Sequence, residues 1–177
     1  MYTLGVIPAR YESSRFPGKP LIDLKGKSMI QRVYEGASKC TLFSEVVVAT
    51  DDERIFNHVT AFGGRVQMTS SSHQSGTDRC GEVLGHFPEA ELVVNIQGDE
   101  PLVEARQLEV LIHAFNDSSV QIATLGNPNL TLADLQNPNR IKLVKDIHND
   151  ALYFSRSAIP FGAKLPAEKW LQNFPYV

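Results

Sequence analysis

The chain has 177 residues, of which 42% are hydrophobic and 21% charged, and its formal net charge is −3 at pH 7. This size and composition are typical of a folded globular protein and exclude a disordered chain. The mildly acidic balance excludes broad nucleic-acid binding, which needs a basic face, and no apolar run approaches the roughly 20 residues of a membrane span.

Short β-rich runs alternate along the chain with segments of helical periodicity. Strands are predicted over residues 3–8, 45–49, 65–68, 92–97 and 120–125, and helices over residues 28–40, 52–62, 75–87 and 104–115. Ser28 is expected to cap the first helix, and Asp51 or Asp52 the second. After a loop over residues 126–139, two strands over residues 140–145 and 151–156 are predicted to form a hairpin.

Strands and helices that alternate at this spacing predict an α/β fold, a three-layer α/β/α sandwich around a mostly parallel, Rossmann-like sheet, followed by a β-hairpin region. Ligands of open parallel sheets bind outside the carboxyl ends of the strands. The pattern therefore directs attention to the segments that follow Pro8, Ala49 and Gln97.

The spacing of the cysteines and the character of the first residues predict a cytoplasmic protein. Cys40 and Cys80 lie far apart without a CxxC spacing, and the five histidines form neither HxH nor HExxH. Residues 1–4 lack the charged and apolar stretches of a signal peptide. We expect free thiols in a reducing compartment, no zinc site and no membrane association.

The loop after the first predicted strand is rich in cations. Pro8 ends the strand because it lacks an amide hydrogen, and Arg10, Arg15 and Lys19 follow with Gly18 among them. Arginine presents a two-pronged donor set to phosphate oxygens, and lysine presents a compact charge. These residues predict a triphosphate site, with a solvated basic surface loop as the alternative.

A nearby glycine, lysine and serine at residues 26–28 resemble the end of a P-loop. A P-loop also needs a glycine five positions before Gly26, where this chain has Leu21. We therefore interpret residues 26–28 as a turn followed by a helix cap. The GxGxxG motif of dinucleotide-binding folds is absent as well.

An acidic segment follows the predicted strand over residues 92–97. Asp99 would lie at the carboxyl edge of the sheet, where its oxygens can bind Mg²⁺ beside a nucleotide. The alternative is that Asp99 or Glu100 caps a turn. Gln97 and Glu100 are expected to make weaker contacts, and helix capping accounts for Asp51 and Asp52.

Four blocks, spread over nearly the whole chain, resemble the 3-deoxy-manno-octulosonate (Kdo) cytidylyltransferases in their order and content. They are IPARYESSRFPGKPL at residues 7–21, HQSGTDR at 73–79, NIQGDEP at 95–101 and ALYFSR at 151–156. The resemblance implies a GT-A-like nucleotidyltransferase fold that transfers CMP from CTP to Kdo for lipopolysaccharide synthesis, with Mg²⁺, in a homodimer. It also implies a nucleotide-binding core over residues 1–125 and the start of a sugar-binding and dimerisation region over residues 126–177.

The same resemblance assigns roles to single residues. It implies that Lys19, Asp99 and Arg10 are catalytic, that Asp99 binds the metal and that Arg79, Gln97 and Arg156 bind the sugar substrate. The nucleotide-binding residues that it implies are Pro8, Ala9, Arg10, Arg15, Lys19, Gln74, Ser75 and Gly76. For Arg79, a surface salt bridge is the alternative.

Three rival interpretations remain. Sialate cytidylyltransferases carry a Gly-Gly-Ser-Lys-Gly run where this chain has residues 11–15, and sugar-1-phosphate nucleotidyltransferases carry a Gly-x-Gly-x-Arg loop that is absent. The third is a CTP-binding module without catalysis. It arises because the family pattern continues past residue 177 with a His-Ile-Gly block and a second metal-binding Asp.

Overall fold

The computed structural model describes residues 1–12, 16–159, 166 and 169. The chain divides into two compact units, Met1–Ala123 and Thr124–Val177. Among the described residues, no helix combines the length and the apolar composition that crossing a membrane requires.

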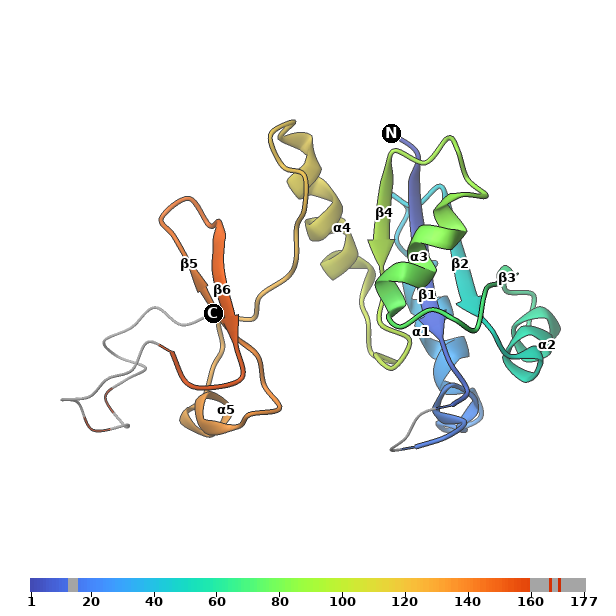
Figure 1. Cartoon of the computed structure of the whole chain (residues 1–177), viewed down its shortest axis with the longest axis horizontal. Helices are drawn as coiled ribbons and strands as arrows, with labels where there is room; N and C mark the ends of the chain where they lie inside the picture. Colours follow the sequence, from blue (N-terminus) through green and yellow to red (C-terminus); the bar gives the residue numbers. More distant parts are fainter. Residues whose placement is uncertain (13–15, 160–165, 167–168, 170–177) are drawn as a thin grey trace. The chain divides into compact units, whose positions relative to one another are not determined.

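The first unit is built on a parallel sheet of four strands (Figure 1). The strands are β1 (Thr3–Ala9), β2 (Glu45–Thr50), β3 (Val66–Met68) and β4 (Leu92–Asn95). Their order across the sheet is β3-β2-β1-β4, and Ile7 of β1 pairs with Val48 of β2 while Gly5 pairs with Val94 of β4. Apart from residues 120–125, each strand predicted for this part of the chain is present.

Helices cover both faces of this sheet, as the three-layer prediction requires. They are α1 (Met29–Ala37), α2 (Glu53–Ala61), α3 (Gly76–Leu84) and α4 (Ala105–His113), with short 3-10 turns at η1 (Lys19–Leu21) and η2 (Ala114–Asn116). Helices α1, α2 and α4 pack on one face through side chains such as Ile30, Ile55 and Leu108. Helix α3 packs on the other face through Cys80 and Val83. The α/β/α sandwich is confirmed.

Strand β1 lies at the point where the strand order reverses. The chain moves from β1 through α1 to β2 on one side, and later returns through α3 to β4 on the other side. Loops that leave the two central strands on opposite sides open a crevice at the carboxyl edge, which is where ligands of such sheets bind. The fold therefore brings the segments after Ala9 and Asn95 together.

The turn at residues 26–28 has the predicted role. Gly26 has a φ of 83°, in the left-handed region that favours glycine, and Asp23 and Ser28 form an isolated bridge across the turn. Ser28 then caps α1, because its hydroxyl accepts a hydrogen bond from the Gln31 amide at 3.2 Å.

The second unit contains a short helix, α5 (Leu132–Gln136), and the predicted hairpin of β5 (Lys142–Lys145) and β6 (Ala151–Ser155). The two strands are antiparallel, with Leu143 opposite Phe154. Lys142 is fully buried, and its ammonium donates to the carbonyl oxygens of Asn137, Arg140 and Arg156 at 2.9, 2.6 and 2.5 Å. This one side chain ties the preceding loop to the end of the hairpin.

The predicted strand over residues 120–125 is wrong. These residues pair with no strand among those that the structure describes, and the Ile122 side chain is 91% exposed. Alternating apolar residues stabilise a strand only where a neighbouring strand accepts its backbone hydrogen bonds and a core covers one face.

Candidate active site

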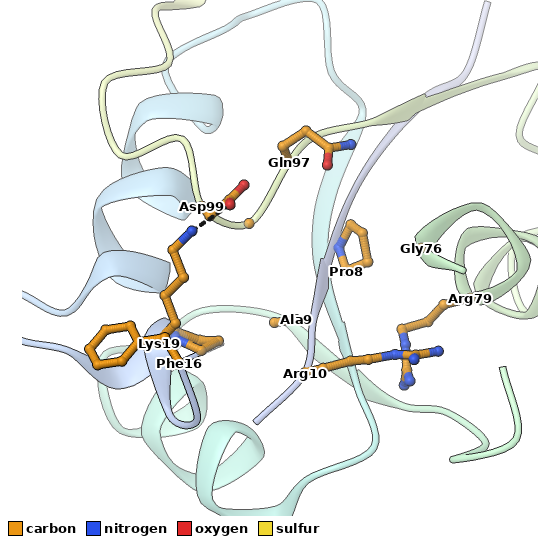
Figure 2. A pocket seen from close by; sticks show the side chains of 11 residues that line it. Pro8, Ala9, Arg10, Phe16, Lys19, Gly76, Arg79, Gln97 and Asp99 are labelled. Carbon is orange, nitrogen blue, oxygen red and sulfur yellow. Dashed lines mark hydrogen bonds and ion pairs between the residues drawn. The ribbon is translucent and has the colours of Figure 1, made fainter. Parts of the chain in front are cut away.

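A pocket of about 530 Å³ lies at the carboxyl edge of the sheet in the first unit, where β1 and β4 end (Figure 2). Its lining residues come from three segments that are distant in sequence, within residues 8–20, 76–79 and 97–99. They are Pro8, Ala9, Arg10, Phe16, Lys19, Pro20, Gly76, Arg79, Gln97, Gly98 and Asp99.

The loop after β1 is closed on itself. The Gly18 amide donates to the Tyr11 carbonyl at 2.8 Å, and Gly18 has a φ of 73°. A Cβ at Gly18 would lie 3.2 Å from the Tyr11 ring, so both the backbone angle and the space favour glycine. The same ring lies under the Arg54 guanidinium, whose central carbon is 3.3 Å from the ring centroid. This closure sets the start of η1 and presents Lys19 to the pocket.

Lys19 and Asp99 meet inside the pocket. The Lys19 ammonium nitrogen lies 2.5 Å from Asp99 Oδ2, and the two side chains are 38% and 52% exposed. Figure 2 shows this contact between the loop after β1 and the loop after β4. A cation predicted for phosphate binding and a carboxylate predicted for metal binding therefore share one site, and both remain accessible to a ligand.

Pro8 forms the surface against which two other loops close. A Cβ on Gly98 would lie 2.6 Å from the Pro8 carbonyl oxygen, and a Cβ on Gly76 would lie 3.1 Å from the Pro8 ring. The first distance is shorter than real Cβ contacts allow, and it involves backbone that cannot rotate away. Glycine at residue 98 is thus a condition for bringing Asp99 to the edge of β1.

Arg79 lies in the pocket wall with its guanidinium buried. Its Nη2 donates to Asp51 Oδ2 at 2.8 Å, and its Nη1 donates to the Thr69 hydroxyl. The side chain is fully buried while that of Asp51 is 18% exposed, so the pair is not a surface salt bridge. The assignment of Asp51 to helix capping is therefore wrong, because its carboxylate is the partner of a buried arginine.

Asp52 does cap α2, as one of the two predicted candidates. Its Oδ1 accepts from the Arg54 amide at 2.9 Å, and Oδ2 lies 2.5 Å from the Arg54 guanidinium. The hydrogen bond from the Arg54 side chain is the main cause that lowers the pKa of Asp52 below its ordinary value.

Two buried donors in the pocket wall have no partner among the described residues. They are Arg10 Nη2 and Arg79 Nε. With Lys19, the two arginines place three cations around the pocket, against two carboxylates, that of Asp99 in the lining and that of Asp51 behind Arg79. A surplus of positive charge with spare N–H donors favours a polyanionic ligand such as a triphosphate.

The block at residues 74–76 reaches the pocket through its last residue. Gly76 lines the pocket and begins α3, whereas Gln74 and Ser75 are not among the lining residues. The Ser75 hydroxyl accepts from the Asp78 amide at 3.1 Å, and the Asp78 carboxylate accepts from the Ser75 amide at 3.1 Å. This capping box holds the first turn of α3 against Pro8.

The remaining predicted residues lie in different places. Gln97 lines the pocket, and its amide nitrogen donates to Asn95 Oδ1 at 3.4 Å. Arg156 belongs to the second unit, where its Nη1 donates to the Pro138 carbonyl at 3.0 Å. Arg15 falls outside the described residues.

The sequence interpretation missed the contributions of Phe16, Pro20 and Gly98 to the pocket, and that of Asp51 behind it. Three of these residues lie inside the motif blocks that carry the resemblance, so their position was a usable signal. For Asp51 the signal was its place directly after a strand, at the edge where ligands bind.

Comparison with known proteins identifies relatives along almost the whole chain. The cytidylyltransferase family profile matches residues 4–176. The 3-deoxy-manno-octulosonate cytidylyltransferase of Geobacter metallireducens is 50% identical over 161 residues, which cover 90% of this chain and 63% of the relative. The protein of the same name from Parabacteroides distasonis is 48% identical, with 99% of this chain and 71% of the relative covered.

A solved structure shows the same relationship in three dimensions. CMP:2-keto-3-deoxy-manno-octonic acid synthetase, complexed with CTP, is 47% identical and superposes with a TM-score of 0.87. The match covers 93% of this chain and 68% of that protein. The chain thus spans about two thirds of the length of these relatives.

Proposed function

The chain belongs to the cytidylyltransferase family, with relatives named as 3-deoxy-manno-octulosonate cytidylyltransferases, and from this we propose that it transfers CMP from CTP to Kdo. The observation that carries the proposal is the meeting of Arg10, Lys19 and Asp99 in one pocket at the edge of the sheet. The reaction is attack by the anomeric hydroxyl oxygen of Kdo on the α-phosphorus of CTP. The bond from that phosphorus to the oxygen that bridges it to the β-phosphorus breaks, pyrophosphate leaves, and the proton of the attacking hydroxyl passes to solvent.

The cations of the loop after β1 bind and orient the triphosphate in this proposal. Phosphoryl transfer depends mainly on positioning and on neutralising charge in the transition state. Lys19 is accessible, and it comes from a loop whose shape is set by the Gly18 to Tyr11 hydrogen bond. Arg10 has a buried donor in the same wall, and no described residue accepts from it. Both residues are therefore placed to stabilise the charge that grows on pyrophosphate.

Asp99 is the residue that would hold Mg²⁺. Among the described residues no group of three or more His, Cys, Asp or Glu side chains could hold a metal ion without the nucleotide. Magnesium suits this donor set, because it is commonly held by one or two carboxylates together with substrate phosphates and water. When bound, the ion would polarise the α-phosphate and lower the pKa of the attacking hydroxyl.

The cytosine of CTP and the sugar acid are assigned to different residues. We place the cytosine beside Pro8, Ala9 and residues 74–76 at the start of α3, because Gly76 packs against the Pro8 ring. Gln97 faces the sugar acid, since it lines the pocket beside Asp99. The sugar-binding roles that the resemblance implies for Arg79, which lines the pocket, and for Arg156 of the second unit also belong to this proposal.

Pyrophosphate release, measured with CTP, Kdo and Mg²⁺ together and with each omitted in turn, tests the reaction. We expect release only when all three are present, and no Mg²⁺-dependent release from Asp99→Asn. Asp117→Asn is the matched control, because Asp117 has an exposed carboxylate that accepts hydrogen bonds from Ser119, two residues later, and does not line the pocket. Release without Kdo would contradict the transfer, and an active Asp99→Asn variant would place the metal elsewhere.

A CTP-binding module without catalysis is not favoured, because the relatives at about 50% identity carry the names of cytidylyltransferase enzymes. The same experiment separates the two interpretations. CTP binding by calorimetry without any release of pyrophosphate would support the module and reject the enzyme.

Cytoplasmic location, a homodimer and a role in lipopolysaccharide synthesis complete the proposal. The two cysteines are free and buried, which supports a reducing compartment. The hairpin exposes Leu152, Tyr153 and Phe154 by 63, 62 and 51%, and a partner subunit would cover such a surface. Sedimentation equilibrium of the protein measures the subunit number, and a monomer at all concentrations would reject the dimer.

A further inference from the structure

A buried polar network lies behind the pocket wall. Arg79 of α3 is fully buried and donates to Asp51, the first residue after β2, and to Thr69, the first residue after β3. The Thr69 hydroxyl in turn donates to the Thr50 carbonyl at 3.1 Å. One guanidinium therefore joins the ends of two strands to the helix that begins at Gly76.

Stability alone does not account for this arrangement. Removing two charges from water costs several kcal/mol per ion, and a buried ion pair is often no more stabilising than apolar side chains of the same volume. An apolar side chain would therefore serve equally well if residue 79 only filled space between α3 and the sheet.

This polar network also borders the pocket. Arg79 lines the pocket together with Gly76, which lies three residues earlier on α3 and packs against the Pro8 ring. Figure 2 shows the side chains of Arg10 and Arg79 extending toward one another along the same wall. In the part of the chain that the structure describes, Arg79 Nε and Arg10 Nη2 are the two buried side-chain donors without a partner.

From these contacts we propose that Asp51 is a positioning residue for nucleotide binding, which acts by holding the Arg79 guanidinium in the pocket wall. The carboxylate offsets the positive charge of Arg79, so that this group can remain buried beside Arg10. It also fixes the first turn of α3 against Pro8, on the surface that receives the nucleotide. The inference rests on the proposed function, because the nucleotide is taken to be CTP.

The test compares Asp51→Ala with the double variant Asp51→Ala/Arg79→Met, in both folding stability and CTP affinity. The single variant leaves a buried guanidinium without its carboxylate, so both quantities fall. In the double variant methionine fills the space without a charge, so stability recovers toward that of the native protein. CTP affinity by calorimetry stays at least tenfold weaker, because the positioned guanidinium is gone.

Two further variants sharpen the comparison. Asp51→Asn keeps an acceptor of the same shape and is expected to fall between the native protein and Asp51→Ala in CTP affinity. Glu45→Ala is the matched control, because Glu45 begins the same strand β2 and pairs with Arg65 at 2.5 Å, with a carboxylate 19% exposed against 18% for Asp51. It lies away from the pocket and is expected to leave CTP affinity unchanged.

The outcomes distinguish this inference from the function on which it rests. A double variant that binds CTP as tightly as the native protein would show that the pair is only structural, and it would overturn the inference alone. Increased affinity in Asp51→Ala would also overturn it, because the carboxylate would then act only by opposing the ligand's charge. A native protein that does not bind CTP would reject the proposed function, and this inference with it.

Discussion

Replacing Lys19 by methionine removes one positive charge from the pocket while nearly preserving the length of the side chain. Lys19 contacts Asp99 at 2.5 Å and is 38% exposed, so its charge acts in a partly solvated environment. Two unit charges about 4 Å apart interact by about 4 kcal/mol at the effective dielectric constant of roughly 20 that applies near protein surfaces.

Solvent screening reduces the loss expected for Lys19→Met to about 2 to 3 kcal/mol, which is close to the loss of one preorganised donor at other active sites. This corresponds to a fall of roughly 30- to 150-fold in the kcat/KM for CTP. Folding stability should change little, because an exposed ion pair contributes less than about 1 kcal/mol and shifts the Tm of a protein of this size by about 4 °C at most.

Steady-state pyrophosphate release and thermal unfolding measure the two quantities separately. Lys27→Met is the matched control, because Lys27 pairs with Glu35 at 2.6 Å with similar exposure, 44% and 39%, and does not line the pocket. The control should share the small change in Tm and keep native kinetics. Equal kinetics for Lys19→Met and Lys27→Met would refute the reasoning, since Lys19 would then be another surface cation.

Other expected outcomes concern backbone space, the hairpin and a thiol. Gly98→Ala should weaken CTP binding at least tenfold in calorimetry, because its Cβ would lie 2.6 Å from the Pro8 carbonyl oxygen. The control Gly81→Ala should bind CTP normally, because a Cβ there meets no atom within 4 Å. Lys142→Met should destabilise the second unit by about 2 to 4 kcal/mol in urea unfolding, because three carbonyl oxygens lose a charged donor whose side chain is fully buried. An unchanged free energy of unfolding in that variant would contradict this role of Lys142. Burial raises the pKa of the Cys80 thiol to about 11, so roughly 0.1% is thiolate at pH 8, and alkylation followed by mass spectrometry should label it only after unfolding.

Most of the secondary structure could be predicted because it depends on local patterns. The apolar spacing after Ser28 predicts the helix that became α1, and the cap at Ser28 is present. The strand predicted over residues 120–125 is absent because a strand also depends on contacts with segments that are distant in sequence. This segment is as rich in apolar and β-branched residues as a real strand, but the sheet offers no neighbour there among the described residues.

The sequence predicted which residues lie at the site better than it predicted which side chains they contact. Lys19 and Asp99 each follow a predicted strand, so both could be expected at the carboxyl edge of the sheet. The partner of Arg79 could not be expected, because helical periodicity indicates which face a residue occupies and not which side chain it meets. Asp51 was accordingly assigned to a helix cap instead of to the buried pair.

Composition, hydrophobic period and motif spacing were enough to establish an α/β chain with cations after one strand and a carboxylate after another. Only the folded molecule decided that these two strands are neighbours, with β1 between β2 and β4. Local preferences act over a few residues, whereas strand order depends on packing between segments that are distant along the chain. The 2.5 Å contact between Lys19 and Asp99, 80 residues apart, is a product of that order.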